Sequence, residues 1–587
     1  MGTFTDFIVE LRRRRVFRVV AYYAGFVFVI IQIMDGTFEL LGIPGWAGRL
    51  IITLLAIGFP IAMILAWVYD ITDRGIVRTK GRTEAPTGAR PLLVTLTIVS
   101  VIAVLATVSA TRKWWSYGSL APQTLSIAVL PFANWDGNSE DDYFADGMTE
   151  ELISRLSRIP GLNVIARTSV MQYKGSTKRV RLIGEELGVS IILSGSVRRA
   201  TGKVRITGQL IDARTERHLW TESYDREVDE ANIFYLQDEV ARKIADVLEG
   251  RLAMENLYPQ RSAPTTSMAA YDLYLRGKHH LAQRTPDAIL MAIVELRAAI
   301  EADTNFVNAY AELANAYNLY PFYIIGREPG VLPSAAEAIN HALRLDPESA
   351  EAYAALAAYE HFHRWNMELA EQAYLQAIAL NPGYVPARHW YGVFLADVHG
   401  DLDASLAELA RARALDPYSP IINTNLGDVL FEFGRYQAAE EQYWHVLEID
   451  PNFSGALYGL GLVYMVQGRF LEAEAVFIKI GSPDRGWAYA ALGKRQQAEA
   501  FLDSLFVAEV RARVDPVDFL GTYGGLGMED SVISTLNAAI RQRSPYLLFW
   551  RRHLLRAGLD STHAMYRKVQ RERSLKPPEL QAQIGGR

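Results

Sequence analysis

Three long apolar stretches stand in the first 110 residues of the chain. They cover residues 16–34, 50–69 and 91–110. Each is close to the roughly 20 residues that an α-helix needs to cross about 30 Å of hydrocarbon. The second and third also lack the polar stripe of a buried helix in a soluble protein. The pattern therefore predicts a membrane anchor with three transmembrane helices in residues 1–118.

Basic residues are distributed unevenly around these stretches. Five arginines lie before the first stretch or at its edge, and five basic residues lie between the second and third, whereas only Arg49 separates the first two. Positive charge favours the cytoplasmic side, so we expect a cytoplasmic N-terminus and soluble domains outside the cytoplasm. Arg112 and Lys113 oppose this orientation. The sequence leaves open whether Asp35 and Glu39 act inside the membrane or lie at its outer surface.

From Thr124 onward, short β-rich runs alternate with segments of helical period. The expected strands are 126–132, 163–167, 190–199, 204–213 and 217–224, and the expected helices are 150–159, 180–187 and 234–252. Thr149 is a typical helix start, with Glu150 and Glu151 in the first turn. This order predicts a small α/β sandwich over residues 119–255, with helices on one side of the sheet.

The C-terminal half contains a repeat. Its clearest markers, at intervals of 35, 35 and 34 residues, are Asp346-Pro347, Asn381-Pro382, Asp416-Pro417 and Asp450-Pro451. The glycines Gly427 and Gly461, and the aromatics Tyr443 and Phe477, hold matching positions in successive units. This period is close to that of the tetratricopeptide repeat, a helical hairpin that stacks into a solenoid.

We therefore expect a C-terminal all-α solenoid over residues 256–565, with degenerate units at both ends. Residues 320–333 interrupt the period like a loop insertion. The segment 566–587 is rich in charge, proline and glycine, so it is predicted to be a disordered tail.

A stack of such hairpins has a concave groove that can hold a peptide or a partner surface. Fixed positions of the first helix in each repeat line it; here they are Tyr359, Phe362, His363, His389, Asp397, Asp428, Phe431, Glu432, Tyr458 and Met465. The mixture of aromatic and acidic side chains favours a protein ligand over an anionic one.

Composition excludes several kinds of chemistry. The chain has no cysteine, which removes disulfides, thiolate zinc sites and a cysteine nucleophile. Asn134, Asp136, Asn138 and Glu140 alternate like calcium ligands, but the glycine and the twelfth position of a calcium loop do not match. No phosphate-binding glycine motif occurs. We therefore expect no catalytic or metal-binding residues and no cofactor, and the net charge of −6 argues against nucleic acid as a partner.

Several phrases of the sequence resemble a known bacterial architecture. SIAVLPF, DDYFADGMTEELISRLSRI, LGVSIILSGSVRR and TERHLWTESYDR resemble the TolB-like N-terminal domain, which is related to that of FlgO-type proteins. RRRRVFRVVAYY and GFPIAMILAWVYDITDRGIVR are similar to the membrane module that often accompanies this domain before tetratricopeptide repeats. The resemblance covers about residues 10–250 and implies a place in the bacterial inner membrane. It implies little about chemistry, and the chain lacks the cyclase or winged-helix domain of that architecture.

Together these features predict a non-enzymatic, membrane-anchored scaffold that docks protein partners through a periplasmic α/β domain and the repeat groove. The expected partners are the lipid bilayer and a membrane or periplasmic protein complex, and association with a second copy of the chain stays open. The alternative is a transmembrane sensor that binds a small ligand or peptide outside the cytoplasm. An enzyme is the third class, and the sequence shows no nucleophile–base pair to support it.

Overall fold

The computed structural model describes most of the chain after residue 124. The described residues are Tyr23, Ile30, Leu55, 69–72, 75–78, 125–134, 139–200, 203–227, 239–244, 246–248, 265, 267–324, 331–507, 515–548, 550–559 and 563–573. The chain forms two compact units, Met1–Gln123 and Thr124–Arg587. The predicted boundary near residue 255 lies outside the described residues.

In the first unit the structure describes a short β-hairpin. Strand β1 (Tyr69–Thr72) pairs antiparallel with β2 (Gly75–Arg78), and Tyr69 stands opposite Arg78. In the same unit the hydroxyl of Tyr23 donates a hydrogen bond to the carbonyl of Leu55.

The predicted fold class needs correction at the N-terminus. Within the part of the chain that the structure describes, no helix combines the length and the apolar character needed to cross a bilayer. The three predicted spans lie almost wholly outside the described residues. Tyr69, expected to end the second span, instead begins strand β1, because its backbone groups pair with those of Arg78 across the hairpin.

The second unit begins with a mixed β-sheet. Its strands are β3 (Leu125–Val129), β4 (Ala133–Asn134), β5 (Leu162–Val164), β6 (Ile191–Ala200), β7 (Lys203–Asp212) and β8 (His218–Glu227). They lie in the order β5-β3-β6-β7-β8, with β4 beside β6. The β3 pairings with β5 and β6 are parallel, whereas β6, β7 and β8 form an antiparallel meander in which Ser196 faces Thr207 and Thr207 faces Ser223.

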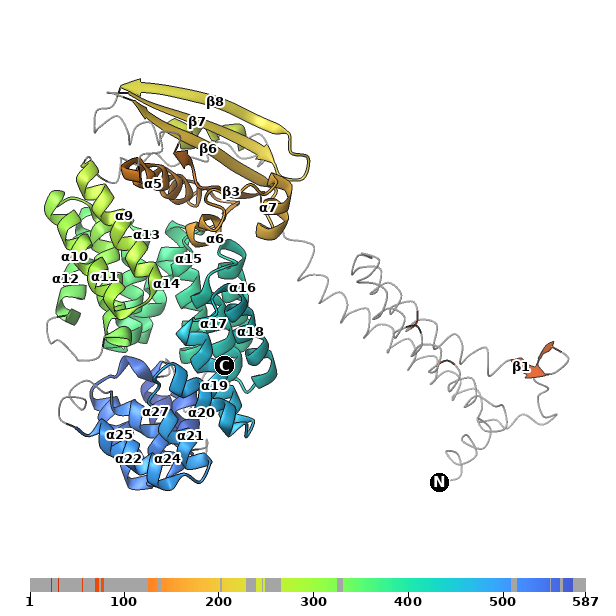
Figure 1. The fold of residues 1–587 in the computed structure, drawn as a ribbon, viewed down its shortest axis with the longest axis vertical. Coiled ribbons are helices and arrows are strands. Elements are labelled where there is room, and N and C mark those ends of the chain that lie inside the picture. Colours follow the sequence, from red (N-terminus) through yellow and green to blue (C-terminus); the bar gives the residue numbers. More distant parts are fainter. Residues whose placement is uncertain are drawn as a thin grey trace, which may run out of the picture. The chain divides into compact units, whose positions relative to one another are not determined.

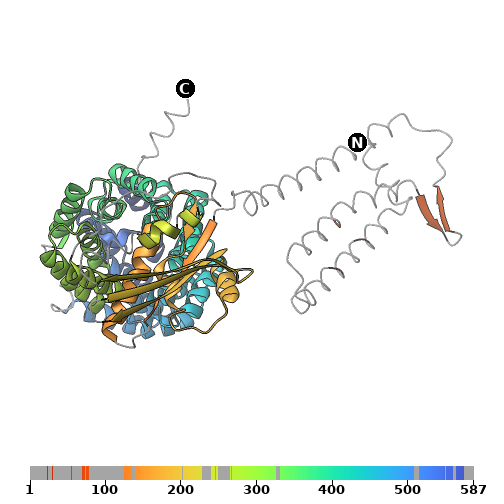
Figure 2. The ribbon, with the colours of Figure 1, turned by 90° about the horizontal axis from the view of Figure 1, so that it is seen from above.

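Helices pack against this sheet and close its core. They are α5 (Ser139–Leu156), α6 (Arg167–Met171), α7 (Val180–Leu187) and the helical residues 239–244 and 246–248. Apolar side chains at helical spacing, such as Met148, Leu152 and Leu156 of α5, bury against Ile127 and Leu193 of the strands. Figure 1 shows α5 and α6 between the sheet and the helices of the repeats, and Figure 2 looks onto the sheet with those helices behind it.

Most of the predicted elements of this region are confirmed, and α7 begins and ends as expected. The start of α5 is not. The helix begins ten residues before Thr149, whose hydroxyl lies inside it and accepts a hydrogen bond from the backbone N–H of Phe132 at 3.0 Å. Gly147 lies inside α5, where a Cβ would lie 2.8 Å from Leu275 of the packed helix α9. Close helix packing, rather than a turn, therefore explains this glycine.

The rest of the unit is helical. Its first part consists of α9 (Met268–Gln283), α10 (Pro286–Ala302), α11 (Val307–Tyr323), α12 (Val331–Leu345), α13 (Ala350–Tyr359), α14 (Met367–Leu380), α15 (Val385–Phe394), α16 (Leu402–Leu415), α17 (Pro420–Glu432), α18 (Tyr436–Ile449), α19 (Ser454–Val466) and α20 (Phe470–Lys479). Its last part consists of α21 (Arg485–Ala491), α22 (Arg495–Leu505), the 3₁₀ turn η3 (Pro516–Phe519), α24 (Leu520–Gly525), α25 (Glu529–Arg541), the 3₁₀ turn η4 (Pro545–Leu547), α26 (Trp550–Arg556) and α27 (Ala564–Arg573).

The repeated Asx-Pro pairs form the turns between successive hairpins. The side chains of Asp346, Asn381 and Asp450 each accept a hydrogen bond from the backbone N–H two residues later, at 2.9, 3.1 and 3.0 Å. This is the Asx turn, which the short side chains of Asp and Asn favour. The repeat period in the sequence thus marks a recurring hydrogen-bonded turn.

Two of the first helices end in a π-helical turn. These turns are η1 (Glu360–Arg364) after α13 and η2 (Leu395–His399) after α15, and they occupy equivalent places in successive repeats. Each closes on a residue in the left-handed region, Trp365 with φ 57° and Gly400 with φ 66°. A π turn widens the helix by one residue and changes which carbonyls are available to other elements.

Two predictions are wrong in part, one on the loop insertion within the repeats and one on the C-terminal tail. The expected insertion at residues 320–333 is shorter, because α11 continues to Tyr323 and α12 begins at Val331. The expected disordered tail starts too early, because α27 runs to Arg573 and buries Met565 and Val569 in the C-terminal core. Residues 574–587 lie outside the described residues.

Candidate docking site

The predicted groove residues lie on the first helices of four successive repeats. Tyr359 is on α13, Phe362 and His363 in η1, His389 on α15, Asp397 in η2, Asp428, Phe431 and Glu432 on α17, and Tyr458 and Met465 on α19. Only Tyr359 and Tyr458 are partly exposed, and the others are buried. The groove is therefore already filled by protein where these residues lie.

Helix α26 of the same chain fills much of it. The side chain of Arg552 lies 3.2 Å from Glu432, between Nε and Oε1, and 3.3 Å from Asp428, between Nη2 and Oδ1. The backbone N–H of Arg552 also donates to Oε1 of Glu432 at 3.1 Å. All three side chains are buried. Asp428 and Glu432, which form an acidic wall on α17, thus hold an arginine of the protein's own C-terminal region.

A second arginine repeats this arrangement one helical turn further on. Arg556 donates from Nε and Nη2 to Oδ1 of Asp484, at 2.9 and 2.5 Å. The other carboxylate oxygen of Asp484 accepts a hydrogen bond from the hydroxyl of Tyr458 at 2.9 Å. Asp484 precedes α21 directly, so this pair joins α26 to the start of the next hairpin.

The backbone of the two π turns supplies further acceptors. Arg551 donates to the carbonyl of Ala396 at 3.1 Å, and the indole N–H of Trp550 donates to the carbonyl of Asp397 at 3.3 Å. Both carbonyls belong to η2. At η1, Arg543 donates to the carbonyl of Arg364 at 2.9 Å. Donors from α26 and from the turn after α25 therefore bind the carbonyls of both π turns.

A chain of buried hydrogen bonds supports the acidic wall from behind. His389 is bonded to Asn425 at 2.8 Å, Asn425 donates to Asp428 at 3.0 Å, and Tyr443 donates to Asp428 at 2.8 Å. In the neighbouring repeat, His361 lies 3.1 Å from the carboxylate of Asp397. These contacts hold the carboxylates in place, which makes His389 a supporting residue rather than a lining one.

Burial and charge shape the protonation of this site. Burial raises the pKa of Glu432 to about 7, although Arg552 and Arg551 act to lower it. Burial also lowers the pKa of His553 well below its usual value, and the neighbouring Arg556 and Arg552 add to this effect. Burial alone would lower the pKa of Arg552, but Asp428 and Glu432 raise it above its usual value. The arginine therefore remains charged inside the groove.

The remaining predicted residues pack rather than line a free surface. Phe431 and Met465 belong to the core between α17 and α20, with the ring centroid of Phe431 5.2 Å from that of Tyr436. Phe362 packs edge-on against Trp390 at 5.0 Å, and His363 is bonded to the carbonyl of Asn318 at 3.0 Å. The spacing in the sequence predicted the helices that carry these residues. It could not predict which of their side chains α26 covers.

Three residues that complete the site were not expected from the sequence, namely Asp484, Arg552 and Arg556. Asp484 follows the last clear repeat, and the two arginines lie in a helix that matches the repeat pattern poorly. For Arg552 and Arg556, the signal in the sequence is their spacing of four positions, which places both on one face of a helix.

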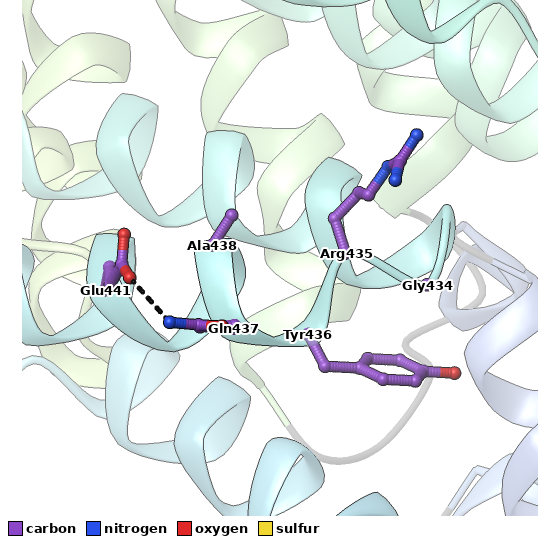
Figure 3. Close-up of a pocket in the computed structure, with 6 residues that line it drawn as sticks. All are labelled: Gly434, Arg435, Tyr436, Gln437, Ala438 and Glu441. Atoms are coloured by element: carbon purple, nitrogen blue, oxygen red, sulfur yellow. Dashed lines mark hydrogen bonds between the residues drawn. The ribbon is translucent and has the colours of Figure 1, made fainter. Parts of the chain in front are cut away.

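A separate hollow of about 330 Å³ lies at the turn between α17 and α18. It is lined by Gly434, Arg435, Tyr436, Gln437, Ala438 and Glu441. Figure 3 shows the side chains of Arg435 and Tyr436 pointing in different directions, while Gln437 donates to Glu441 at 3.4 Å. All the lining residues come from one turn and one helix, so no polar groups converge from opposite walls as a small-molecule site requires. Among the described residues, no group of three His, Asp or Glu side chains is placed to hold a metal ion.

Comparisons with known proteins agree with the repeat geometry. Two tetratricopeptide repeat family models match residues 395–452 and 430–492. The C-terminal region of this protein carries tetratricopeptide repeats. A solved structure, that of PilW, a widely conserved type IV pilus biogenesis factor, covers 35% of this chain and 96% of PilW at 23% identity, with a TM-score of 0.30.

The α/β region matches a different family from the one expected. Residues 123–243 match the model of the second domain of HilA/YgeH-like transcriptional regulators, so the TolB-like assignment is not supported. "Transcriptional regulator HilA" of Salmonella typhimurium is 23% identical over 302 residues, which are 50% of this chain and 52% of the relative. "Putative adenylate cyclase 3" of Rhizobium meliloti is 42% identical over 193 residues, 33% of this chain and 32% of the relative. The chain thus spans about a third to a half of the length of these curated relatives.

The α/β region and the tetratricopeptide repeats share a polar interface. Ser169 of α6 donates to the buried carboxylate of Asp416 at 2.6 Å, and the backbone N–H of Ala166 donates to the carbonyl of Leu415 at 2.7 Å. Arg158 lies 2.8 Å from Glu351. Burial raises the pKa of Asp416 to about 6, against the lowering effect of the surrounding hydroxyls. At this turn the backbone N–H of Tyr418, two residues after Asp416, donates to the hydroxyl of Ser169 at 2.9 Å instead of to the Asp416 side chain.

A second contact joins α5 to the first hairpin of the repeats. Lys278 of α9 pairs with Glu150 of α5, and the hydroxyl of Tyr271 donates to the carbonyl of Gly147 at 3.2 Å. Burial would lower the pKa of Lys278, but the charges of Glu150 and Glu312 raise it above its usual value. The α/β region is therefore bound at several separated places along the repeats.

Proposed function

We propose that this protein is a non-enzymatic scaffold that docks protein partners on its tetratricopeptide repeats and the α/β region bound to them. The observation that carries the proposal is the buried acidic wall of α17, which holds the arginine side chain of α26. Glu432 binds both the guanidinium and the backbone N–H of Arg552. This contact supports a groove whose chemistry suits a polypeptide helix.

The attachment of the α/β region supports a scaffold in a second way. Contacts at α5 and α6, such as Glu150 with Lys278 and Ser169 with Asp416, join it to both the first hairpin and a central repeat turn. Two separated attachments restrict rotation of one part on the other. A partner that spans both parts would therefore meet a fixed surface, which lowers the ordering cost of binding.

The test is reconstitution with a partner. The full chain, tagged in its own cells, is purified after mild cross-linking, and any protein recovered at constant ratio is produced separately and titrated against the purified chain by calorimetry. We expect saturable binding with fixed stoichiometry. Repeated elution of the chain alone, with no binding by any recovered protein, would refute the scaffold proposal.

An enzymatic role is the alternative suggested by the relative named a putative adenylate cyclase. If the scaffold proposal holds, supplying the purified full chain with ATP and a divalent cation should give no cyclic AMP above a blank. Product formation that scales with protein concentration would replace the scaffold proposal with an enzymatic one. The predicted location of the α/β region and repeats, outside the cytoplasm of a bacterium, stays a prediction.

A further inference from the structure

The contacts of α26 follow the order of the repeats. Trp550 binds the carbonyl of Asp397 in η2, Arg552 binds Glu432 on α17, and Arg556 binds Asp484 at the start of α21. Asp397 and Glu432 lie 35 residues apart, at equivalent positions of successive repeats. Helix α26 therefore lies along the inner wall as a ligand helix would, with contacts at the repeats of α15 and α17 and, beyond α19, at the start of α21.

The apolar side chains of α26 do not join the core of the wall. Trp550 and Leu554 pack with Leu520, Tyr523 and Leu536 in the C-terminal core. The wall helices α17 to α20 form their own core around Tyr443, Leu460 and Phe477. Hydrogen bonds and ion pairs account for the α26 contacts with α17 and with the start of α21. Apolar contacts at the edges, such as Trp365 and Tyr489 against the C-terminal core, complete the junction, but the contacts of Arg552 and Arg556 with the wall are polar and have the character of a docked interface.

Buried ion pairs of this kind specify a partner more than they stabilise a fold. Removing two charges from water costs several kcal/mol for each ion, and the attraction between them only roughly repays that cost. An arginine from another chain would restore the same pairs once α26 had left. If an arginine-bearing helix of another protein replaced α26, each buried carboxylate of the wall would therefore keep a charged partner.

We propose that Asp428, Glu432 and Asp484 form a recognition site for a helix that carries two arginines four residues apart, that α26 occupies this site in cis, and that a helix of the same chemistry in a partner protein competes with α26 for it. This inference rests on the proposed scaffold function and names both its partner chemistry and its regulation. The site is closed to a partner helix as long as α26 occupies it.

The first test uses a peptide copy of α26. A fluorescent peptide of residues 545–559 is titrated by anisotropy into the full chain and into the full chain with Arg552→Met and Arg556→Met. We expect the double variant to bind the peptide at least about tenfold more tightly, because the internal competitor is weakened. A peptide with both arginines changed to methionine is the matched control and should not bind either protein. Equal binding of the two peptides, or no gain in the double variant, would overturn the proposal.

A second measurement keeps the test valid if the double variant does not fold. Because the chain has no cysteine, a single Leu555→Cys substitution places one dye on α26, and Ala410→Cys on α16 gives a matched site away from the groove. Excess wild-type peptide should change the fluorescence at residue 555 in a saturable way and leave residue 410 unchanged. The Glu432→Gln and Asp484→Asn changes in the labelled protein should weaken this response by about tenfold or more. No response at residue 555 at millimolar peptide would overturn the proposal.

The outcomes separate this inference from the scaffold proposal. A partner that binds the full chain but leaves the dye at residue 555 unaffected would refute competition with α26 while supporting a scaffold. Binding of the peptide with no protein partner recovered would support the site and refute the scaffold. A dimer of the full chain that the peptide dissociates would instead identify a second copy as the occupant, contrary to the proposal.

Discussion

The guanidinium of Arg556 lies 2.5 Å from the carboxylate of Asp484, and both side chains are buried although 72 residues of chain separate them. A buried charge that loses its partner costs several kcal/mol, whereas loss of both charges costs far less. This pair therefore ties the last helices of the repeats to the start of α21. It is also a place where single and double substitutions should differ.

Replacing only one member of this pair should be the more damaging change. We expect Arg556→Ala or Asp484→Ala to lower the free energy of unfolding by about 3–5 kcal/mol, and the double variant to lose less than the sum. Urea denaturation followed by circular dichroism measures all three. The exposed pair Arg495 and Glu499 is the control, and Arg495→Ala should cost about 1 kcal/mol or less. Additive losses at Arg556 and Asp484 would contradict a coupled buried pair.

The raised pKa of Glu432 predicts a pH dependence of stability. Its pKa is about 7 in the folded protein, against 4.5 for an unperturbed glutamate, because of burial. The folded state thus binds the proton more tightly, and this stabilisation is complete below pH 4.5 and is lost as pH rises towards 7. Arg552, Arg551 and Asp397 are the charged groups that act on it.

The Glu432→Gln variant isolates this contribution. The free energy of unfolding of the wild type minus that of the variant should fall between pH 4.5 and 7, by about 1.4 kcal/mol for each unit of pKa shift. Urea melts at half-unit intervals of pH measure it. Ala410→Ser, at an exposed position of α16 and with no ionisable group, is the control and should give a flat difference. A flat difference for Glu432→Gln as well would mean that Glu432 titrates normally.

The small residues of the repeat should be intolerant of larger side chains. A Cβ at Gly427 would lie 2.7 Å from the ring of Tyr443, and one at Gly461 would lie 2.3 Å from the ring of Phe477. We expect Gly427→Leu or Gly461→Leu to cost about 1–3 kcal/mol or more through overpacking. Thermal melting measures the loss, and Ala410→Leu at an exposed helical position is the control. A variant that melts with the wild type would show that the two helices do not cross at the glycine.

Phe431 should behave as a core residue. Spacing in the sequence made it a groove residue, but it is buried between α17 and α18. We expect Phe431→Ala to cost about 3–5 kcal/mol, measured by chemical denaturation. Leu471→Ala, at a side chain that is 68% exposed, should change stability by about 0.5 kcal/mol or less. If Phe431→Ala and Leu471→Ala lowered the free energy of unfolding by equal, small amounts, Phe431 would line the groove surface instead.

Gly383 should control the contact between the α/β region and the repeats. A Cβ at Gly383 would lie 2.4 Å from the backbone oxygen of Ser157, which cannot move as a side-chain end could. We expect Gly383→Ala to lower the melting temperature and to separate unfolding of the two parts in calorimetry. Gly455→Ala is the control, because its Cβ would meet only side-chain atoms, at 3.1 Å or more. A single unchanged transition in Gly383→Ala would show that the two parts do not touch there.

Local patterns in the sequence were sufficient for most elements of the second unit. The Asx-Pro pairs, the matching glycines and the aromatics located the hairpins because a turn and a close helix crossing each depend on residues near one another in the chain. The same holds for α7 and for the meander of β6, β7 and β8. By contrast, the helix start was expected at Thr149, and the reason for the small residue Gly147 inside α5 is Leu275, on a helix far along the chain.

The sequence by itself determined that the C-terminal region is a stack of helical hairpins. Only the tertiary structure decided what lies against the acidic wall of α17. The curvature of a solenoid is the sum of small rotations between neighbouring repeats. No local sequence pattern determines where that sum places α26. The meeting of Arg552 with Glu432, across 120 residues of chain, is a result of that accumulated rotation and of the cost of leaving either charge buried alone.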